Sequence, residues 1–365
     1  MGCGAVKQDP LEGYQIFKKY EFSMKIGVGA TSQVHEASQK ESGKPVAVKA
    51  VVKEESHLAG KSVLLLHKEV DIMRMLNHPN ICKLLEMFED HLIFYFVLEI
   101  CEGGTLFERL ETDIVLEETD GAVIARQMFS AVAHLHDKNI LHRDLRPENW
   151  LFSTFSQESP VKLINFGLAE MCDNQTALSQ PCGTLHYVAP EVLRGKYGRP
   201  SDAWTLGVLV FLMLYGSYPF DGDSVSLVLR AILSAEPDWS DSCYALSNDV
   251  KDLLKQMLVK DPDERINIVA AYNHGWIKKS APRKSEIEKA QRPSQKERNS
   301  QRMSKSVSGV LPEIKGSPGK GRRTSALVTN DLLRQIAADA MNNMALPATV
   351  SEHEENSGLP CAVGS

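Results

Sequence analysis

A glycine pair, Gly103-Gly104, divides this chain into two parts whose hydrophobic patterns are typical of different secondary structures. In the first part, residues 20–53 contain short β-branched runs around a glycine-rich turn, and residues 92–100 form an apolar run that contains one charged residue, Glu99, as strands do. Residues 61–76 interrupt the strands with apolar side chains at helical spacing. The first part is therefore expected to form a small antiparallel sheet with one helix, and the glycine pair to act as a hinge.

Beyond the hinge, helical patterns dominate. Residues 121–137 and 248–259 each place their apolar side chains on one face, as core-facing helices do. The longest apolar run, from Ala203 to Tyr215, is shorter than the roughly 20 residues that a membrane-spanning helix needs, so a buried core helix is expected there. The fold class that follows is α+β, with a small sheet lobe and a larger, mainly helical lobe.

The N-terminal segment, residues 1–19, bears on where the protein acts. The seven cysteines are odd in number, scattered and without metal-ligand spacing, which indicates reduced thiols and a cytoplasmic location. Gly2 and Cys3 offer a myristoylation glycine beside a palmitoylation cysteine, whereas Val6 stands where Ser or Thr is preferred. Membrane association through Gly2 and Cys3 and a frayed terminus are the two alternatives, and a Gly2→Ala variant that stays on membranes would exclude the first.

The C-terminal part has a different composition. Residues 278–326 are rich in Lys, Arg, Ser and Gln, with few bulky apolar residues, which is typical of a basic disordered linker. Residues 327–346 fit a short amphipathic helix, and 347–365 a disordered tail. Calmodulin usually binds a basic helix with bulky anchors, and neither segment combines the two features. Calmodulin is therefore not an expected partner, nor is nucleic acid, and the sequence gives no indication of the oligomeric state.

Two features of the first part suit phosphate binding. The run Ile26-Gly27-Val28-Gly29 opens a turn that closes at Val34, and small residues there let backbone N–H groups approach phosphate oxygens. Lys49 follows the strand-like run Val46-Ala47-Val48, where its ammonium group can reach phosphates if a carboxylate holds it. Glu69 is the candidate carboxylate. Alone, the turn would equally fit a plain hairpin. The presence of Lys49 downstream is what favours a phosphate-binding turn.

The strongest chemical signal is the run His142-Arg143-Asp144-Leu145-Arg146-Pro147-Glu148-Asn149, followed by Ile164-Asn165-Phe166-Gly167. The first resembles the catalytic loop of protein kinases, and the second their Asp-Phe-Gly magnesium site with Asn165 in place of aspartate. Together with the glycine-rich turn, Lys49, Glu69 and Ala189-Pro190-Glu191 in family order, they resemble a eukaryotic-type protein kinase domain. The segments 182–191 and 261–266 are similar to the calcium/calmodulin-dependent group of serine/threonine kinases.

This resemblance covers residues 20–277 and implies a bilobal protein-kinase-like fold, with a small lobe at 20–101 and a large lobe at 102–277. It implies ATP and Mg²⁺, or Mn²⁺, as cofactors and a protein as substrate. The catalytic residues that it implies are Asp144, Lys49, Glu69, Arg146 and Asn149, and the metal ligands are Asn149 and Asn165. The nucleotide-binding residues that it implies are Ile26, Gly27, Val28, Gly29, Val34, Ala47, Lys49, Glu99, Cys101 and Leu151.

Further roles follow from the same resemblance. Asp144 would accept or orient the proton of the incoming hydroxyl, with Arg146 replacing the usual lysine beside it. Thr184 would contact Asp144, Asp202 would brace the catalytic loop, and Glu191 would pair with Arg265. The family's acidic residue after the hinge is Thr105 here, which leaves Glu148 as the remaining candidate for a substrate arginine.

Asn165 separates two functional hypotheses. Asparagine keeps one carbonyl oxygen but loses a charge, and Mg²⁺ is usually held by only one or two carboxylates. Weaker metal binding would remove stabilisation of the charge that develops on the phosphoryl oxygens. The first hypothesis is a serine/threonine kinase with impaired metal use, and the alternative is a nucleotide-binding pseudokinase scaffold without phosphotransfer.

Overall fold

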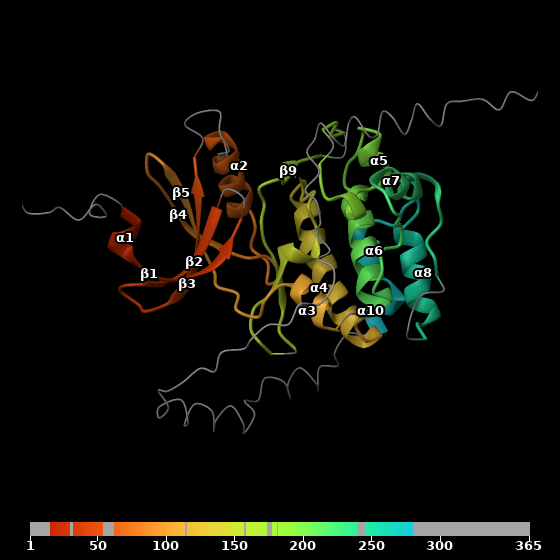
Figure 1. Ribbon diagram of the computed structural model, residues 1–365, viewed down its shortest axis with the longest axis horizontal. Helices are drawn as coiled ribbons and strands as arrows, with labels where there is room; N and C mark the ends of the chain where they lie inside the picture. The colour runs from red at the N-terminus through yellow and green to blue at the C-terminus, as the bar shows by residue number, and fades with distance from the viewer. Residues whose placement is uncertain are drawn as a thin grey trace, which may run out of the picture.

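The computed structural model describes residues 15–29, 32–53, 62–113, 115–156, 158–173, 177–180, 182–239 and 245–279. Over these ranges the chain forms a small lobe built on a sheet and a larger lobe built mainly from helices (Figure 1). The expected α+β class and the two-lobe arrangement are thus confirmed. The Gly2-Cys3 motif, most of the basic linker and the amphipathic helix expected at 327–346 lie outside the described residues.

The small lobe is a five-stranded antiparallel sheet in the order β1-β2-β3-β5-β4, with α2 packed on one face and α1 on the other (Figure 1). The helix expected over residues 61–76 is α2. Although the sequence assigns residues up to 19 to a separate segment, α1 buries Ile16 against the sheet and so belongs to this lobe. The elements are α1 (Gln15–Lys19), β1 (Tyr20–Val28), β2 (Ser32–Gln39), β3 (Pro45–Val52), α2 (Val63–Arg74), β4 (Leu84–Glu89) and β5 (Ile93–Leu98).

Alternation along β3 divides its side chains between two separate cores. Val46 and Val48 pack in the cluster beneath α1, whereas Val51 packs in the cluster that contains α2 and continues into the large lobe. Successive side chains of a strand point to opposite faces, so Ala47 and Lys49 share the α2 face with Val51. The β-strand period therefore directs a lysine toward a helix that follows it in the chain.

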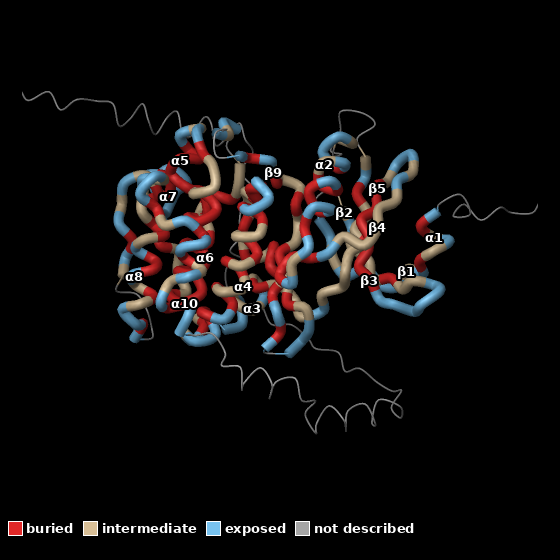
Figure 2. The backbone as a smooth tube through the Cα atoms, turned by 180° about the vertical axis from the view of Figure 1, so that it is seen from behind, coloured by how far each residue is buried: buried red, intermediate tan, exposed pale blue. Residues whose placement is uncertain are grey.

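The large lobe is organised around α6, the helix expected from the apolar run. Its residues from Ala203 to Tyr215 are buried except Thr205, and it packs between α4 and α8. The buried residues in Figure 2 concentrate along this interior and on the inner strands, while the exposed ones follow the loops. A left-handed Gly216, with φ 72°, ends α6 and accommodates a conformation that disfavours other residues. Among the described residues, no helix combines the length and the apolar content that crossing a bilayer requires.

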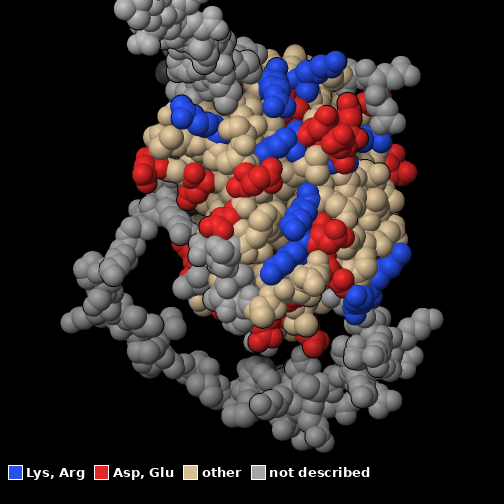
Figure 3. All heavy atoms as spheres, turned by 90° about the vertical axis from the view of Figure 1, so that its right-hand side faces the viewer, with Lys and Arg blue, Asp and Glu red and all other residues tan. Residues whose placement is uncertain are grey.

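The remaining elements place loops between the lobes. Two short antiparallel pairs form here, β6 with β9 and β7 with β8. The catalytic loop, residues 142–149, connects β6 to β7. Lys, Arg, Asp and Glu side chains are interspersed over the end of the large lobe seen in Figure 3. The elements are α3 (Leu106–Asp113), α4 (Glu118–Asp137), β6 (Ile140–Leu141), η1 (Pro147–Asn149), β7 (Trp150–Phe152), β8 (Val161–Leu163), β9 (Glu170–Met171), η2 (Leu185–Tyr187), α5 (Pro190–Leu193), α6 (Pro200–Tyr215), α7 (Val225–Ser234), α8 (Asn248–Met257), α9 (Ile268–Tyr272) and α10 (Gly275–Lys279).

Candidate active site

Strand pairing places the glycine-rich turn beside Lys49. Gly27 on β1 lies opposite Val34 on β2, and Val34 lies opposite Lys49 on β3. Lys49 in turn lies opposite Phe96 on β5, and its Nζ is 5.3 Å from the centre of the Phe96 ring. Residues from distant parts of the sequence thus form one row across four strands, because antiparallel register brings them together.

The turn itself is open to solvent on one side. The side chains of Ile26 and Val28 are 46% and 71% exposed, as expected for residues that would cover a bound ligand. The N–H of Gly29 donates to the carbonyl oxygen of Ser32 at 2.8 Å, so this donor is used within the turn. Residues 30–31, at the tip, lie outside the described residues.

Lys49 and Glu69 form an ion pair across the small lobe. Lys49 Nζ lies 2.9 Å from Glu69 Oε1, and the glutamate side chain is only 2% exposed. A carboxylate buried this deeply needs a nearby cation or donors, since an isolated buried charge is costly. The pair therefore fixes α2 against β3 and leaves the ammonium group at the boundary of the lobes.

The residues expected around a nucleotide base lie where the lobes join. Ala47 is 8% exposed on the α2 face of β3. The N–H groups of Glu102 and Gly103 donate to carbonyl oxygens of Ser153 and Phe152, at 3.2 and 2.9 Å. The hinge therefore runs beside β7, the strand that carries Leu151.

Glu99 and Cys101 contribute to this junction in different ways. The Glu99 carboxylate accepts from the Lys83 N–H at 2.7 Å and from Lys162 Nζ at 2.9 Å, so its side chain is held within the hinge. Cys101 is partly exposed, and a hydrogen bond from Cys82 lowers the pKa of its thiol. Within the hinge, the Glu99 N–H donates to the Lys83 carbonyl oxygen at 3.0 Å, and the Glu99 carbonyl oxygen accepts from the Cys82 thiol at 3.6 Å.

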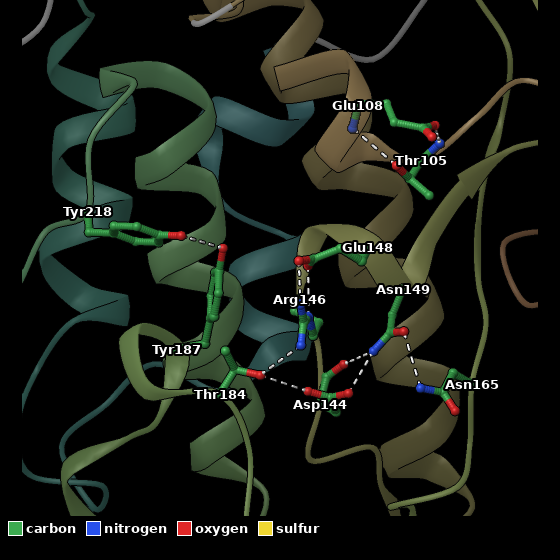
Figure 4. Close-up of polar contacts among 10 residues, drawn as sticks. All are labelled: Thr105, Glu108, Asp144, Arg146, Glu148, Asn149, Asn165, Thr184, Tyr187 and Tyr218. Atoms are coloured by element: carbon green, nitrogen blue, oxygen red, sulfur yellow. Dashed lines mark hydrogen bonds and ion pairs between the residues drawn. The ribbon is translucent and has the colours of Figure 1, made fainter. Parts of the chain in front are cut away.

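The catalytic loop carries Asp144 at the centre of a network of hydrogen bonds (Figure 4). Asn149 Nδ2 donates to Asp144 Oδ2 at 2.8 Å and to the Asp144 carbonyl oxygen at 2.7 Å. Thr184 Oγ1 donates to Asp144 Oδ1 at 3.4 Å, which is the contact expected from the sequence. Each carboxylate oxygen of Asp144 thus has a donor, and the side chain is held in one orientation.

Asp202 holds the backbone of the same loop, as expected. Its carboxylate accepts from the N–H groups of His142 and Arg143, both at 3.3 Å, and from His136 Nε2 at 2.9 Å. Burial opposes ionisation of Asp202, but the hydrogen bond and charge of His136 outweigh it, and the pKa of Asp202 is lowered. Arg143 can therefore keep its left-handed φ of 69° because both adjoining N–H groups are anchored.

Arg146 is paired within the loop. Its Nε donates to Glu148 Oε2 at 2.8 Å and its Nη2 to Glu148 Oε1, a bidentate arrangement visible in Figure 4. These hydrogen bonds raise the pKa of Arg146. Arg146 Nη1 also donates to Thr184 Oγ1 at 3.4 Å. The carboxylate expected to meet a substrate arginine is thus occupied by an arginine of the same loop.

Asn165 and Asn149, the expected metal ligands, contact each other. Asn165 Nδ2 donates to Asn149 Oδ1 at 3.3 Å, and Asn165 has a left-handed φ of 65°, a conformation that asparagine tolerates. No group of three or more His, Cys, Asp or Glu that could hold a metal is found among the described residues. Two neutral amides bonded to each other do not fit the metal pair that the resemblance implies.

Sequence reasoning missed a link between the lobes. Glu170 on β9 forms ion pairs with Lys68 on α2 and, at 3.4 Å, with Arg143 Nη2 in the catalytic loop. Arg143 also donates to the Leu168 carbonyl oxygen at 2.6 Å and to the Tyr197 hydroxyl at 3.2 Å. No local pattern marks Glu170, because its partners are distant in the sequence. The structure thus brings the expected residues together in two groups, the strand row with Lys49 and Glu69 and the loop network around Asp144, and adds Glu170.

Comparison with known proteins gives a consistent result. The protein kinase domain family matches residues 20–277. The chain is 38% identical over 256 residues to calcium-dependent protein kinase 5 of Plasmodium falciparum (isolate 3D7), covering 70% of this chain and 44% of that protein. It is 33% identical over 331 residues to calcium/calmodulin-dependent protein kinase type IV of Rattus norvegicus, covering 89% and 67%. It is 35% identical over 266 residues to myosin light chain kinase A of Dictyostelium discoideum, covering 72% and 90%. The matches to calcium-dependent protein kinase 5 of two Plasmodium species span less than half of those proteins.

Proposed function

The chain belongs to the protein kinase family, and from this premise we propose that it transfers the γ-phosphoryl group of ATP to serine or threonine side chains of a protein substrate. The observation that supports this most directly is the ion pair between Lys49 Nζ and Glu69 Oε1 at 2.9 Å. Phosphoryl transfer in protein kinases needs this pair in place. The pair is formed here, and hydrogen bonds hold the Asp144 carboxylate, and both features support phosphoryl transfer.

Each residue has a proposed role. Asp144 orients the substrate hydroxyl and accepts its proton, since its carboxylate is held by Asn149 and Thr184. Lys49 neutralises charge on the nucleotide phosphates, beneath the glycine-rich turn that contains Gly27. In this family the reaction depends mostly on positioning and charge, so these side chains need no covalent step.

Asn165 is proposed to slow the reaction. It leaves the site with one carboxylate fewer than the family pattern, and its amide bonds to Asn149. Charge that develops on the phosphoryl oxygens is therefore less well compensated. We expect weak transfer. The alternative function, a nucleotide-binding pseudokinase scaffold, is favoured by the same hydrogen bond because it engages Asn149 Oδ1, one of the expected metal-ligating oxygens.

The substrate is proposed to be a protein whose recognition does not depend on arginine. Thr105 stands where the family pattern has an acidic residue, and its N–H and hydroxyl bond to Glu108. Glu148 is occupied by Arg146, so a substrate guanidinium would have to displace a bidentate pair. Figure 4 shows the Arg146–Glu148 pair beside Asp144, with the Thr105–Glu108 pair farther from it. A buried charge without a matching partner disfavours binding, so arginine gains little here.

A phosphotransfer assay with purified full chain and radiolabelled ATP tests the proposal. We expect slow transfer to serine peptides at similar rates with and without arginine, loss of transfer in Asp144→Asn, and at least about a tenfold gain in Asn165→Asp. Strong dependence on arginine would contradict the substrate proposal alone. If no peptide is phosphorylated although ATP raises the melting temperature, the scaffold is the correct function.

Our proposals about other partners rest on sequence features. The name of one relative includes calmodulin, but we do not transfer that partner, since the basic linker lacks bulky anchors. Membrane association through Gly2 and Cys3 is retained as a proposal with the Gly2→Ala test. These residues lie outside the described part of the chain.

A further inference from the structure

Asp144, Asn149 and Asn165 form a directed chain of hydrogen bonds. Asn149 must turn its NH₂ group toward Asp144, because both atoms it meets there, the carbonyl oxygen and Oδ2, only accept. Its Oδ1 therefore faces Asn165, and Asn165 must present its own NH₂ group, as it does at 3.3 Å. The chemistry of the partners fixes both amide orientations.

This chain of hydrogen bonds replaces the interaction that a cation would otherwise make with Asn149 Oδ1. An aspartate at position 165 would turn a carboxylate oxygen toward Asn149 Oδ1, placing two acceptors against each other, and a cation between them would relieve the repulsion. Asn165 instead supplies a donor. The site is thus satisfied by its own side chains, and Asn165 does more than remove a ligand.

The charge facing a triphosphate changes as well. A nucleoside triphosphate carries several negative charges, and a carboxylate at position 165 would repel it unless a cation were present. Asn165 is neutral, Glu69 is paired with Lys49, and both oxygens of Asp144 accept hydrogen bonds. Lys49 then supplies a positive charge that attracts the phosphates.

We propose that the nucleoside triphosphate binds beside Lys49 and Gly27 without a divalent cation. This inference rests on the proposed nucleotide site but not on phosphotransfer. The Asn165 NH₂ group occupies one lone pair of Asn149 Oδ1, Asn149 is held by two hydrogen bonds to Asp144, and positions 149 and 165 offer a cation no carboxylate oxygen. The ligand of this site is therefore free ATP.

The experiment measures ATP binding by calorimetry with the full chain, once in excess EDTA and once in excess Mg²⁺. We expect the Kd to differ by less than about threefold between the two conditions. Asn165→Asp should weaken binding in EDTA by at least about tenfold and regain affinity with Mg²⁺. Asn165→Gly is the matched control, because glycine accepts the left-handed φ but offers neither charge nor donor.

Asn165 has two effects that can then be separated: it is neutral, and it supplies a hydrogen-bond donor to Asn149. In Asn165→Gly, which also carries no charge at position 165, the ratio of the Kd values in EDTA and in Mg²⁺ should stay below about threefold, while the protein should melt at a lower temperature without nucleotide, since Asn149 Oδ1 loses its donor. A Kd that rises tenfold or more in EDTA for the unmodified chain overturns the inference, whatever the variants do. Cation-independent binding without any phosphotransfer would overturn the proposed kinase activity and leave this inference standing.

Discussion

At the scale of single residues, His142 shows how one buried ring fixes the geometry of the catalytic loop. Its Nδ1 accepts from the Asp144 N–H at 3.3 Å, and its Nε2 lies 3.2 Å from the Ile164 carbonyl oxygen. Both contacts are satisfied only by the neutral ring with the proton on Nε2. The ring also meets Phe166 edge-on, at 5.1 Å between centres. A proton on Nδ1 would therefore disturb the backbone that carries Asp144.

This predicts a pH dependence with a defined sign. Complete burial lowers the pKa of His142 below its ordinary value of about 6.5, although Asp202 and Asp144 oppose the shift. The unfolded chain then takes up a proton at higher pH than the folded chain, so stability present above about pH 6.5 is lost as the pH falls below it. We expect the melting temperature to decrease across this window.

His142→Phe is the comparison, because it keeps a ring against Phe166 but cannot titrate. Its melting temperature should fall less steeply with acid, though not stay constant, since burial also lowers the pKa of His78. The lowered pKa of Asp202 acts in a separate window, with stability lost only as the pH falls below about 4. Identical slopes for the two proteins between pH 7 and about 5 would show that His142 does not titrate in this way.

At the scale of elements, Glu170 couples a helix, a strand and a loop. It pairs with Lys68, the residue before Glu69 on α2, and with Arg143. Arg143 reaches Tyr197, whose hydroxyl donates to the Gln180 carbonyl oxygen at 2.6 Å. The position of α2 is thus linked through Glu170 on β9 to the segment that contains Gln180. The Lys49–Glu69 pair depends on that position, because Glu69 lies on α2.

Glu170→Gln should therefore loosen α2. The Lys68 and Glu170 side chains are 34% and 29% exposed, so the pair contributes only about 0.5 kcal/mol to global stability. Its effect should instead be local: faster amide hydrogen exchange in α2 and weaker ATP binding, with α8 unchanged. Hydrogen exchange with mass spectrometry measures this. Glu86→Gln, which removes a comparably exposed pair with Lys19, should leave α2 unaffected, and equal effects of both variants would refute the link.

At the scale of the whole molecule, a buried ion pair joins α5 to the loop after α8. Arg265 binds both oxygens of Glu191, at 2.5 and 2.9 Å, and donates to the carbonyl oxygens of Val259 and Pro200. The arginine side chain is 0% exposed and the glutamate 4%. This is the pairing expected from the sequence, and it ties the segment after Thr184 to the core of the large lobe.

Arg265→Met should lower the free energy of unfolding by about 3 kcal/mol, because the buried Glu191 carboxylate would lose its counter-charge. Urea unfolding measures the change. Arg74→Met removes a pair with Asp71 that is more than half exposed and should cost less than about 0.5 kcal/mol. Adding Glu191→Leu to Arg265→Met should recover part of the loss, since an apolar pair leaves no buried charge. A double variant less stable than the single one would contradict this account.

Several structural features followed from the sequence because they depend on local patterns. Helical spacing over residues 61–76 predicted α2, and the apolar run from Ala203 to Tyr215 predicted a buried α6. The β-branched run at Val46-Ala47-Val48 predicted a strand that ends near Lys49, whereas β3 continues to Val52. Candidate residues such as Asp144 and Asn165 were identified by motif order. Their hydrogen bonds confirm where they lie, while their roles in catalysis stay predictions.

What the sequence alone determined was therefore the type of each element and the order of its chemically active residues, since periodicity and motifs are properties of neighbours along the chain. Tertiary structure alone decided that Arg146 closes on Glu148, that Asn165 donates to Asn149, and that Glu170 joins Lys68 to Arg143. The reason is physical: a side chain's partner depends on which groups packing brings within about 3 Å, and residues distant in sequence compete for that place.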